Sequence, residues 1–234
     1  MVLSRNTFEP LYYQIREHIR EKINSSEYPP NSMIPSEAEL CEIYQVSRVT
    51  VRKALAELTR EGLLRRMQGK GTFVCAPRIR RDLRDVTSFN EACREMGSVA
   101  STRVISAQLI TAEDSVRQSL LLEGDQVIEI VRLRLSDDQP VMLETNCFPT
   151  IYDDLLREDL SGSLYRLLEV RGVEAARGIH EISLCYATPA QARQLGVNPG
   201  DALLQLDQVI YDQHGAPLHT SHQVIRGDRF TFRI

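Results

Sequence analysis

Long hydrophobic runs are missing from this 234-residue sequence, which nowhere approaches 18 consecutive apolar residues. A transmembrane helix needs about 20 such residues, so the chain is not expected to span a membrane. The first six residues also lack the apolar core of a secretory signal. We therefore expect a cytoplasmic protein with no membrane partner.

Metal-binding patterns are missing as well. The five cysteines are odd in number, widely spaced and include no C-x-x-C pair, so we expect reduced thiols that serve as packing residues. His219 and His222 would face opposite sides of one strand and His214 falls in a turn, a geometry that does not suit a shared metal ion. No metal and no cofactor are expected.

The net charge of −4 at pH 7 argues at first against a nucleic-acid partner. This charge is unevenly distributed. Residues 48–81 contain ten lysines and arginines against two acidic residues, whereas residues 87–234 contain thirteen against twenty-one. The asymmetry indicates a basic patch that precedes an acidic body in the chain, and a basic patch can face an anionic partner.

Residues 8–76 have the pattern of three helices and a hairpin. Leu11, Ile15, Ile19 and Ile23 recur every four residues among charged residues, which predicts a first amphipathic helix. Proline- and asparagine-rich residues after it predict a break before the second helix.

The second predicted helix begins with a capping box formed by Ser36 and Glu39. Its inner stripe would consist of Leu40, Ile43 and Tyr44. The helix is short, because Gln45 and Val46 break it. A third helix that follows it after a tight turn would complete a helix-turn-helix pattern.

That third helix is predicted to start at Ser47 and to stop at Gly62, which suits a position just past a helix end. Arg48, Arg52 and Lys53 lie near its start and away from its apolar stripe. A helix-turn-helix whose second helix begins with cations is typical of DNA recognition.

Two short strand-like segments then flank the turn Gly69-Lys70-Gly71, which predicts a β-hairpin. Next to a helix-turn-helix, such a hairpin is a wing. Its glycines allow close approach of the backbone, and its lysine can contact a phosphate. Taken singly, a charged helix face or a glycine turn is commonly only a solvated surface; the order and spacing make the set specific.

These motifs resemble the winged-helix domain of the GntR family of bacterial repressors, with Pro35 to Leu40, Val46 to Leu55 and Gln68 to Val74 as the matching stretches. The resemblance implies phosphate, base-edge and minor-groove contacts to double-stranded DNA. Many members have arginine where Ala38 stands, so this protein is expected to prefer a different DNA sequence from theirs. The implied DNA-binding residues are Ser36, Arg48, Thr50, Arg52, Lys53, Gly69, Lys70 and Gly71.

Residues 77–86 are predicted to be a basic linker, and residues 87–234 a second domain with an internal repeat. Residues 124–130 resemble residues 200–206, each preceded by a short helical pattern and followed by a polar turn. Two related helix–hairpin units around one antiparallel sheet are therefore expected.

Arg132 and Arg134 are two residues apart on a predicted strand, so both face the same side of the sheet. In the second copy of the repeat Gln208 and Ile210 stand at these positions, so the fold unit itself does not require arginine there. Two such arginines can clamp one anion. Alternatively, they pair with carboxylates on a solvated sheet face.

The second domain resembles the effector-binding (UTRA) domain of the HutC subfamily of GntR regulators, whose fold is similar to that of chorismate lyase. The resemblance implies an α+β chain, with a winged helix-turn-helix followed by an α/β effector domain built on an antiparallel sheet. His219 and Ile225 replace an acid and a tyrosine of the amino-sugar sensors. The implied effector-binding residues are Ser88, Phe89, Arg132, Arg134, Glu144, Ser163 and Tyr165.

Together these features predict a transcriptional repressor that binds a two-fold DNA operator as a homodimer. A small anion, a phosphorylated sugar above all, would release it. A carboxylate effector is an alternative. A lyase-like enzyme is less favoured because no nucleophile–base arrangement has a supporting motif. An architectural DNA-binding protein without a ligand would not explain the paired arginines.

Overall fold

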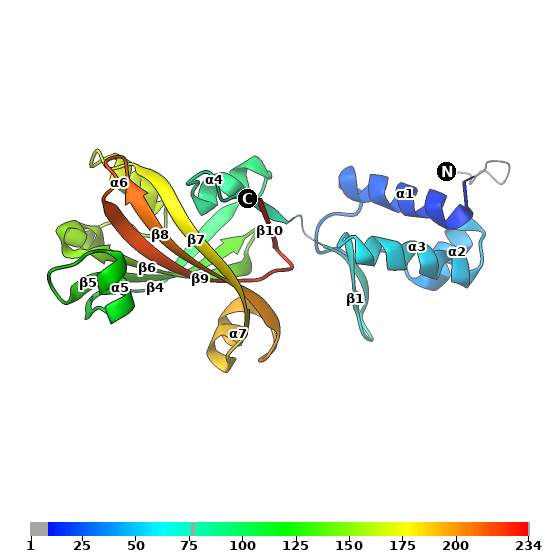
Figure 1. Ribbon diagram of the computed structural model, residues 1–234. Coiled ribbons are helices and arrows are strands. Elements are labelled where there is room, and N and C mark those ends of the chain that lie inside the picture. The colour runs from blue at the N-terminus through cyan, green and yellow to red at the C-terminus, as the bar shows by residue number, and fades with distance from the viewer. Residues whose placement is uncertain (1–8, 76–77, 234) are drawn as a thin grey trace. The chain divides into compact units, whose positions relative to one another are not determined.

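The computed structural model describes residues 9–75 and 78–233 (Figure 1). The chain divides into two compact units between Pro77 and Arg78. Ala76 and Pro77, at the predicted domain boundary, and the first eight residues lie outside the described part.

The first unit contains three helices and a β-hairpin, as the sequence predicts. Its core is formed by apolar residues from every one of these elements, with Ile15, Ile19, Leu40 and Leu55 completely buried. Residue Phe73 of the hairpin also forms a single β-bridge to Met33. The elements are α1 (Leu11–Asn24), α2 (Glu37–Tyr44), α3 (Arg48–Arg60), β1 (Leu64–Met67) and β2 (Gly71–Val74).

The predicted helix ends are confirmed. Ser36 and Glu39 form the capping box of α2, and Ser47 accepts a hydrogen bond at the start of α3. Gly62 follows α3 with a φ of 75°, a left-handed conformation that glycine adopts without strain. The prediction that Ile43 faces inward is wrong: its side chain is exposed, because Leu40 and Tyr44, one turn apart, fill the contact between α2 and the core.

The second unit is built on a six-stranded antiparallel sheet with the order β4-β5-β6-β9-β8-β7. The predicted repeat is visible in this order, since the run β4-α5-β5-β6 recurs as β7-α7-β8-β9 and the two hairpins meet at β6 and β9. The sequence did not single out β7 as a strand. The elements are β4 (Ala100–Thr111), α5 (Asp114–Ser119), β5 (Gln126–Ser136), β6 (Gln139–Pro149), β7 (Ala175–Tyr186), α7 (Pro189–Leu195), β8 (Ala202–Asp212) and β9 (Pro217–Ile225).

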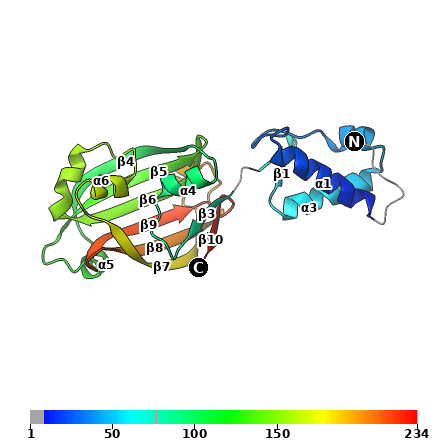
Figure 2. The same ribbon diagram turned by 90° about the horizontal axis from the view of Figure 1, so that it is seen from above.

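Helices cover both faces of this sheet. One face packs against α4 (Phe89–Glu95), the 3-10 helix η1 (Thr150–Arg157) and α6 (Leu164–Glu169). The other face packs against α5 and α7, and Figure 1 shows these two helices on the side away from α4 and α6. Figure 2 looks onto the face that carries α4 and α6.

The segment predicted as a linker, 77–86, is largely part of the second unit. Its residues Ile79–Asp82 form β3, which pairs in parallel with β10 (Phe230–Arg233) near the end of the chain (Figure 2). Ile79 is buried in the same core cluster as Phe230. The second unit therefore begins before the predicted residue 87. The signal for this pairing is non-local, because the two strands are far apart in the sequence.

Candidate functional sites

The first candidate site is an arginine-rich surface of the first unit. Among the residues predicted to contact DNA, Thr50 is half-buried and bonds to Ser47, while the others are exposed. Lys53 lies over the ring of Tyr12, with its amine 3.7 Å from the ring centre. The exposed set is Ser36 at the start of α2, Arg48, Arg52 and Lys53 on α3, and Gly69, Lys70 and Gly71 at the hairpin.

A single carboxylate joins three elements of this surface. Glu37 of α2 accepts a hydrogen bond from Arg66 of β1 at 2.8 Å and one from Arg48 of α3 at 3.3 Å. Arg52 lies 3.9 Å from the same carboxylate. Sequence reasoning missed both Glu37 and Arg66, because nothing in a local pattern indicates that the hairpin folds back to α2. The contact brings α3 and the hairpin together at the start of α2.

The second candidate site is a cavity on the face of the sheet that carries α4 and α6. We refer to it as the arginine pocket. All the predicted effector-binding residues line it, although they come from four separate elements and their flanks: Ser88, Phe89, Arg132, Arg134, Glu144, Ser163 and Tyr165. The structure adds lining residues that the sequence did not single out, among them Arg81, Asn146, Ser221 and Gln223. His219, which the sequence singled out for its difference from the amino-sugar sensors, also lines the pocket.

Arg132 and Arg134 are buried, with side chains 4% and 2% exposed. Arg132 donates a hydrogen bond to Glu144 at 2.6 Å and further bonds to the carbonyl oxygens of Leu160 and Gly162. The alternative of carboxylate pairing on a solvated face is thus half right. A carboxylate is present, but it is buried with the arginines.

Arg134 donates a hydrogen bond to Asn90 and lies over the ring of Phe89, 4.6 Å from its centre. Its Nη1 is 3.7 Å from Glu144, too far for a hydrogen bond. No acceptor among the described residues reaches Nη1 or Nε of Arg134, or Nε of Arg132, and all three atoms are buried. Buried donors are nearly always paired, so these point to an acceptor that is not part of the protein.

Glu144 is ionised in this setting. Burial acts to raise its pKa, but the positive charges of Arg132 and Arg134 and the bond from Arg132 outweigh it and lower the pKa to about 2. The pKa of Arg134 falls to about 10, mainly through burial and then through repulsion from Arg132, so this side chain is still charged at pH 7. The pocket therefore contains more positive than negative charge.

An aromatic wall closes one side of the pocket. His219 stacks on Phe148 with the ring centres 4.8 Å apart, and its Nε2 lies 3.3 Å from the hydroxyl of Tyr165. Burial lowers the pKa of His219 to about 4, so its ring is neutral at pH 7. Burial also raises the pKa of Tyr165, which keeps its hydroxyl protonated. This wall offers neutral hydrogen-bonding groups to a ligand.

Two predicted pocket residues are also helix caps. Ser163 accepts a hydrogen bond from the backbone of Arg166 at the start of α6. Ser88 forms a capping box with Glu91, and both its backbone N–H and its hydroxyl donate to that carboxylate at 2.8 Å. The start of α4 therefore already has a carboxylate partner in Glu91.

The described histidines and cysteines do not come together as a metal site. His222 is exposed and bonds to Asp207, whereas His219 is buried on the opposite face of the same strand. Within residues 9–75 and 78–233, no group of three or more histidine, cysteine, aspartate or glutamate side chains is placed to hold a metal ion. No helix in this part of the chain is long and apolar enough to cross a membrane.

Comparison with known families matches both units. Residues 11–74 match the model of bacterial regulatory proteins of the gntR family, and residues 95–231 match the UTRA domain.

Two curated relatives cover nearly the whole chain. The HTH-type transcriptional repressor NagR of Bacillus subtilis (strain 168) is 33% identical over 99% of this chain and 97% of its own length. The mannosyl-D-glycerate transport/metabolism system repressor MngR of Escherichia coli (strain K12) is 30% identical over 97% and 95%. The crystal structure of PhnF from Mycobacterium smegmatis, 28% identical, matches with a TM-score of 0.71 over 94% of this chain and 97% of that one.

Proposed function

Because the chain belongs to the gntR family of bacterial transcription regulators and carries a UTRA domain, we propose that its arginine pocket binds a small anionic effector that releases it from DNA. The effector proposed is a phosphorylated sugar. The relatives NagR and MngR are repressors, which supports repression rather than catalysis as the activity.

The observation that carries the proposal is the set of buried arginine donors for which no described residue is an acceptor. Arg132 and Arg134 together present three such donor nitrogens on one face of the sheet. A phosphate group has acceptor oxygens enough to bond all three, and charge-assisted bonds of this kind are among the strongest in proteins. A carboxylate can also accept three hydrogen bonds, but it carries a single negative charge, whereas a phosphate monoester carries about −1.5 to −2 at pH 7.

The neutral wall of the pocket supports a polyhydroxylated body for this ligand. His219 and Tyr165 offer uncharged polar atoms, and the Nδ2 of Asn146 is buried without an acceptor among the described residues. Glu144 is held by Arg132, so it serves first as the counter-charge of the arginines. A sugar hydroxyl can both donate to and accept from such groups.

For DNA, we propose that Arg48 and Arg52 of α3 enter the major groove, with Thr50 and Lys53 beside them. Ser36 would contact a phosphate, and Gly69, Lys70 and Gly71 would bring the hairpin to the minor groove. The exposure of these residues supports this, since an arginine can bond bidentately to guanine only if its guanidinium is free to reach a base. A homodimer on a two-fold operator would double the few base contacts of one winged helix.

The test has two stages. Selection from a random duplex pool identifies the operator, and a thermal-shift screen of sugar phosphates and matched sugar acids identifies the effector. A ligand at 100 times its dissociation constant stabilises the protein by about 2.7 kcal/mol. We expect a sugar phosphate to shift the transition and to displace operator DNA, and Arg132→Gln with Glu144→Gln to abolish both effects. A response to sugar acids alone would contradict the phosphate assignment.

A further inference from the structure

A third arginine faces the arginine pocket from outside the main sheet. Arg81 lies on β3, is 9% exposed and lines the cavity together with Arg132, Arg134 and Glu144. The second copy of the repeat has no arginine at the equivalent positions, so its half of the sheet offers no cation of its own to the pocket. Arg81 supplies one from a different element.

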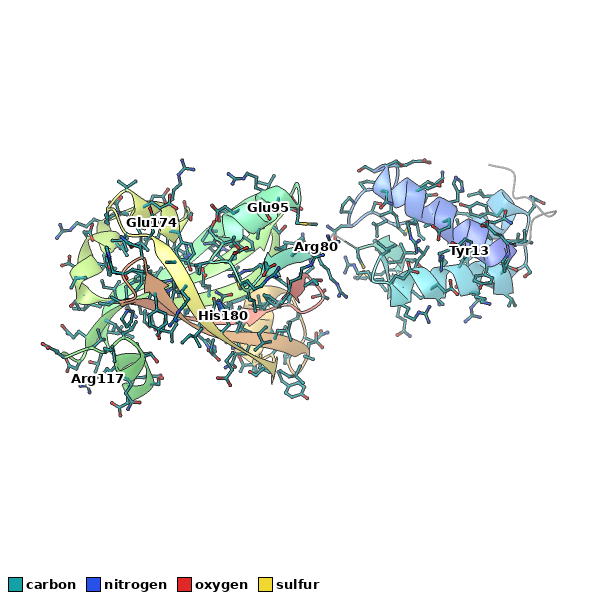
Figure 3. The ribbon with its side chains drawn as sticks, turned by 45° about the horizontal axis from the view of Figure 1, so that its top comes forward. Tyr13, Arg80, Glu95, Arg117, Glu174 and His180 are labelled. Atoms are coloured by element: carbon teal, nitrogen blue, oxygen red, sulfur yellow. The ribbon has the colours of Figure 1, made fainter. Side chains whose placement is uncertain are left out.

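One hydrogen bond positions the side chain of Arg81, and a second donor of the same guanidinium stays available. Arg81 Nη1 donates to Gln223 Oε1 at 2.9 Å. Gln223 donates in turn to Gln208 at 2.8 Å, and Gln208 lies 2.6 Å from His180 Nδ1 on β7, labelled in Figure 3. The Nε of Arg81 is buried, and none of the residues in the described part accepts a hydrogen bond from it. The guanidinium of Arg81 is therefore held in place by Gln223 and can still donate a hydrogen bond to a ligand.

With Arg81 included, three arginines face one carboxylate, so the pocket wall has an excess of two positive charges. A phosphate monoester carries a charge of about −1.5 to −2 at pH 7, whereas a carboxylate carries −1. Burial opposes the charge on Arg81 and lowers its pKa, while Tyr165 and Glu144 act in the other direction. A bound dianion would offset this cost of burial more fully than any monoanion.

The position of Arg81 in the chain gives this contact a second consequence. It lies in β3, whose residues Ile79–Asp82 begin two residues after the end of the first unit. Among the described residues, this short strand pairs only with the four residues of β10. An anion that bonds to Arg81 as well as to Arg132 and Arg134 would add a second link between β3 and the main sheet, beyond the hydrogen bond from Arg81 to Gln223.

We propose that Arg81 is a third anion-binding residue of this pocket, and that ligand contact through it stabilises β3, the segment that leads from the DNA-binding unit. The proposal rests on the proposed anion site and adds to it both a dianion preference and a route from the ligand to the interdomain segment.

The chain offers a matched control, since Arg80, labelled in Figure 3, is the exposed neighbour on the same strand. Binding of inorganic phosphate at pH 8 to the full-length protein is measured by calorimetry for the wild type, Arg81→Gln, Arg81→Lys and Arg80→Gln. We expect Arg81→Gln to weaken binding by about 10- to 100-fold, the loss of one charge-assisted bond. Arg81→Lys should recover part of it, and Arg80→Gln should match the wild type.

Hydrogen exchange provides a readout that a purely structural role would not move. Phosphate should slow exchange of the β3 amides in the wild type and in Arg80→Gln, but not in Arg81→Gln. If Arg81→Gln is poorly folded, Arg81→Lys and the wild-type exchange data still decide the matter. Unchanged affinity in Arg81→Gln, or no protection of β3 in the wild type on binding, overturns this inference and leaves the anion site intact. Absence of wild-type binding, of phosphate and of sugar phosphates alike, overturns the anion site itself.

Discussion

The two units use the same side chain in opposite environments. The side chains of Arg48 and Arg52 in the first unit are 72% and 63% exposed, whereas those of Arg132 and Arg134 in the second are 4% and 2% exposed. Both pairs lie near one glutamate. The exposed pair can leave Glu37 at little cost, since surface ion pairs are worth about 0–1 kcal/mol. The buried pair cannot leave Glu144 without stranding a charge.

This contrast separates a surface that exchanges partners from a pocket that is preorganised. Long exposed arginines can reorient toward DNA, and their field is screened by salt. Buried arginines held by Glu144, Asn90 and backbone carbonyls keep their geometry before a ligand arrives, which reduces the entropy lost on binding. The largest expected difference between the two sites is therefore in how much the loss of one arginine lowers the free energy of unfolding.

Arg132→Ala should strongly destabilise the second unit. It leaves Glu144 buried without its hydrogen-bonded partner, and breaking such a pair costs about 3–5 kcal/mol. Scanning calorimetry of the full chain should show the transition of this unit lowered by roughly 10 °C or more. Arg48→Ala, an exposed control, should leave both transitions within about 0.5 kcal/mol. Equal shifts of the unfolding transition for the two substitutions would contradict the difference proposed between the buried and the exposed arginines.

Arg48→Ala should instead act on DNA. Loss of one good base contact costs about 1–3 kcal/mol, or roughly 10- to 100-fold in operator affinity for each half-site that the dimer contacts. Fluorescence anisotropy with the selected operator measures this, and calorimetry with inorganic phosphate checks that the pocket is unaffected. An undiminished operator affinity would show that the helix α3 does not read DNA through this residue.

The pH dependence of effector binding distinguishes titration of the ligand from titration of His219 in the pocket. Burial holds the pKa of His219 at about 4, below its ordinary 6.5, so the ring stays neutral from pH 5.5 to 8. The second pKa of a phosphate monoester is about 6. Effector affinity should therefore rise as the pH increases through about 6, because the ligand becomes a dianion. The effector identified by the thermal-shift screen is titrated by calorimetry at each pH.

The variant His219→Gln should keep the shape of that profile, whatever its absolute affinity. A midpoint that moves in the variant would assign the titration to His219. The same low pKa has a stability consequence: the unfolded chain takes up a proton near pH 6.5 and the folded chain only near pH 4. The free energy of unfolding of this unit should therefore fall as the pH drops through that range.

The sequence predicted most of what depends on local pattern. Helix caps at Ser36 and Ser47 were found because they follow from short-range spacing, and the repeat was found because two segments of similar sequence adopt the same fold. The paired arginines followed from strand alternation. All the predicted effector residues line one cavity, but their contacts with a ligand remain a proposal.

The missed features all depend on long-range pairing. Arg81 bonds to Gln223, 142 residues away, through a parallel pairing of β3 with β10 that no local pattern indicates. Arg66 meets Glu37 only because the hairpin folds back on α2. Ile43 was placed inside because a two-turn helix gives too few residues to fix its buried face from periodicity alone.

The smallest expected effect concerns Glu37. Glu37→Gln removes the negative charge that Arg48, Arg52 and Arg66 share, so it should raise affinity for non-specific duplex DNA by less than about tenfold, in keeping with the modest energy of exposed ion pairs. Operator affinity should change less, so the ratio of specific to non-specific binding should fall. Glu42→Gln, on the same helix, makes the same charge change as a control. Equal effects of both variants would mean that Glu37 acts only through net charge, and a loss of non-specific affinity would mean that it positions the arginines for phosphate contact.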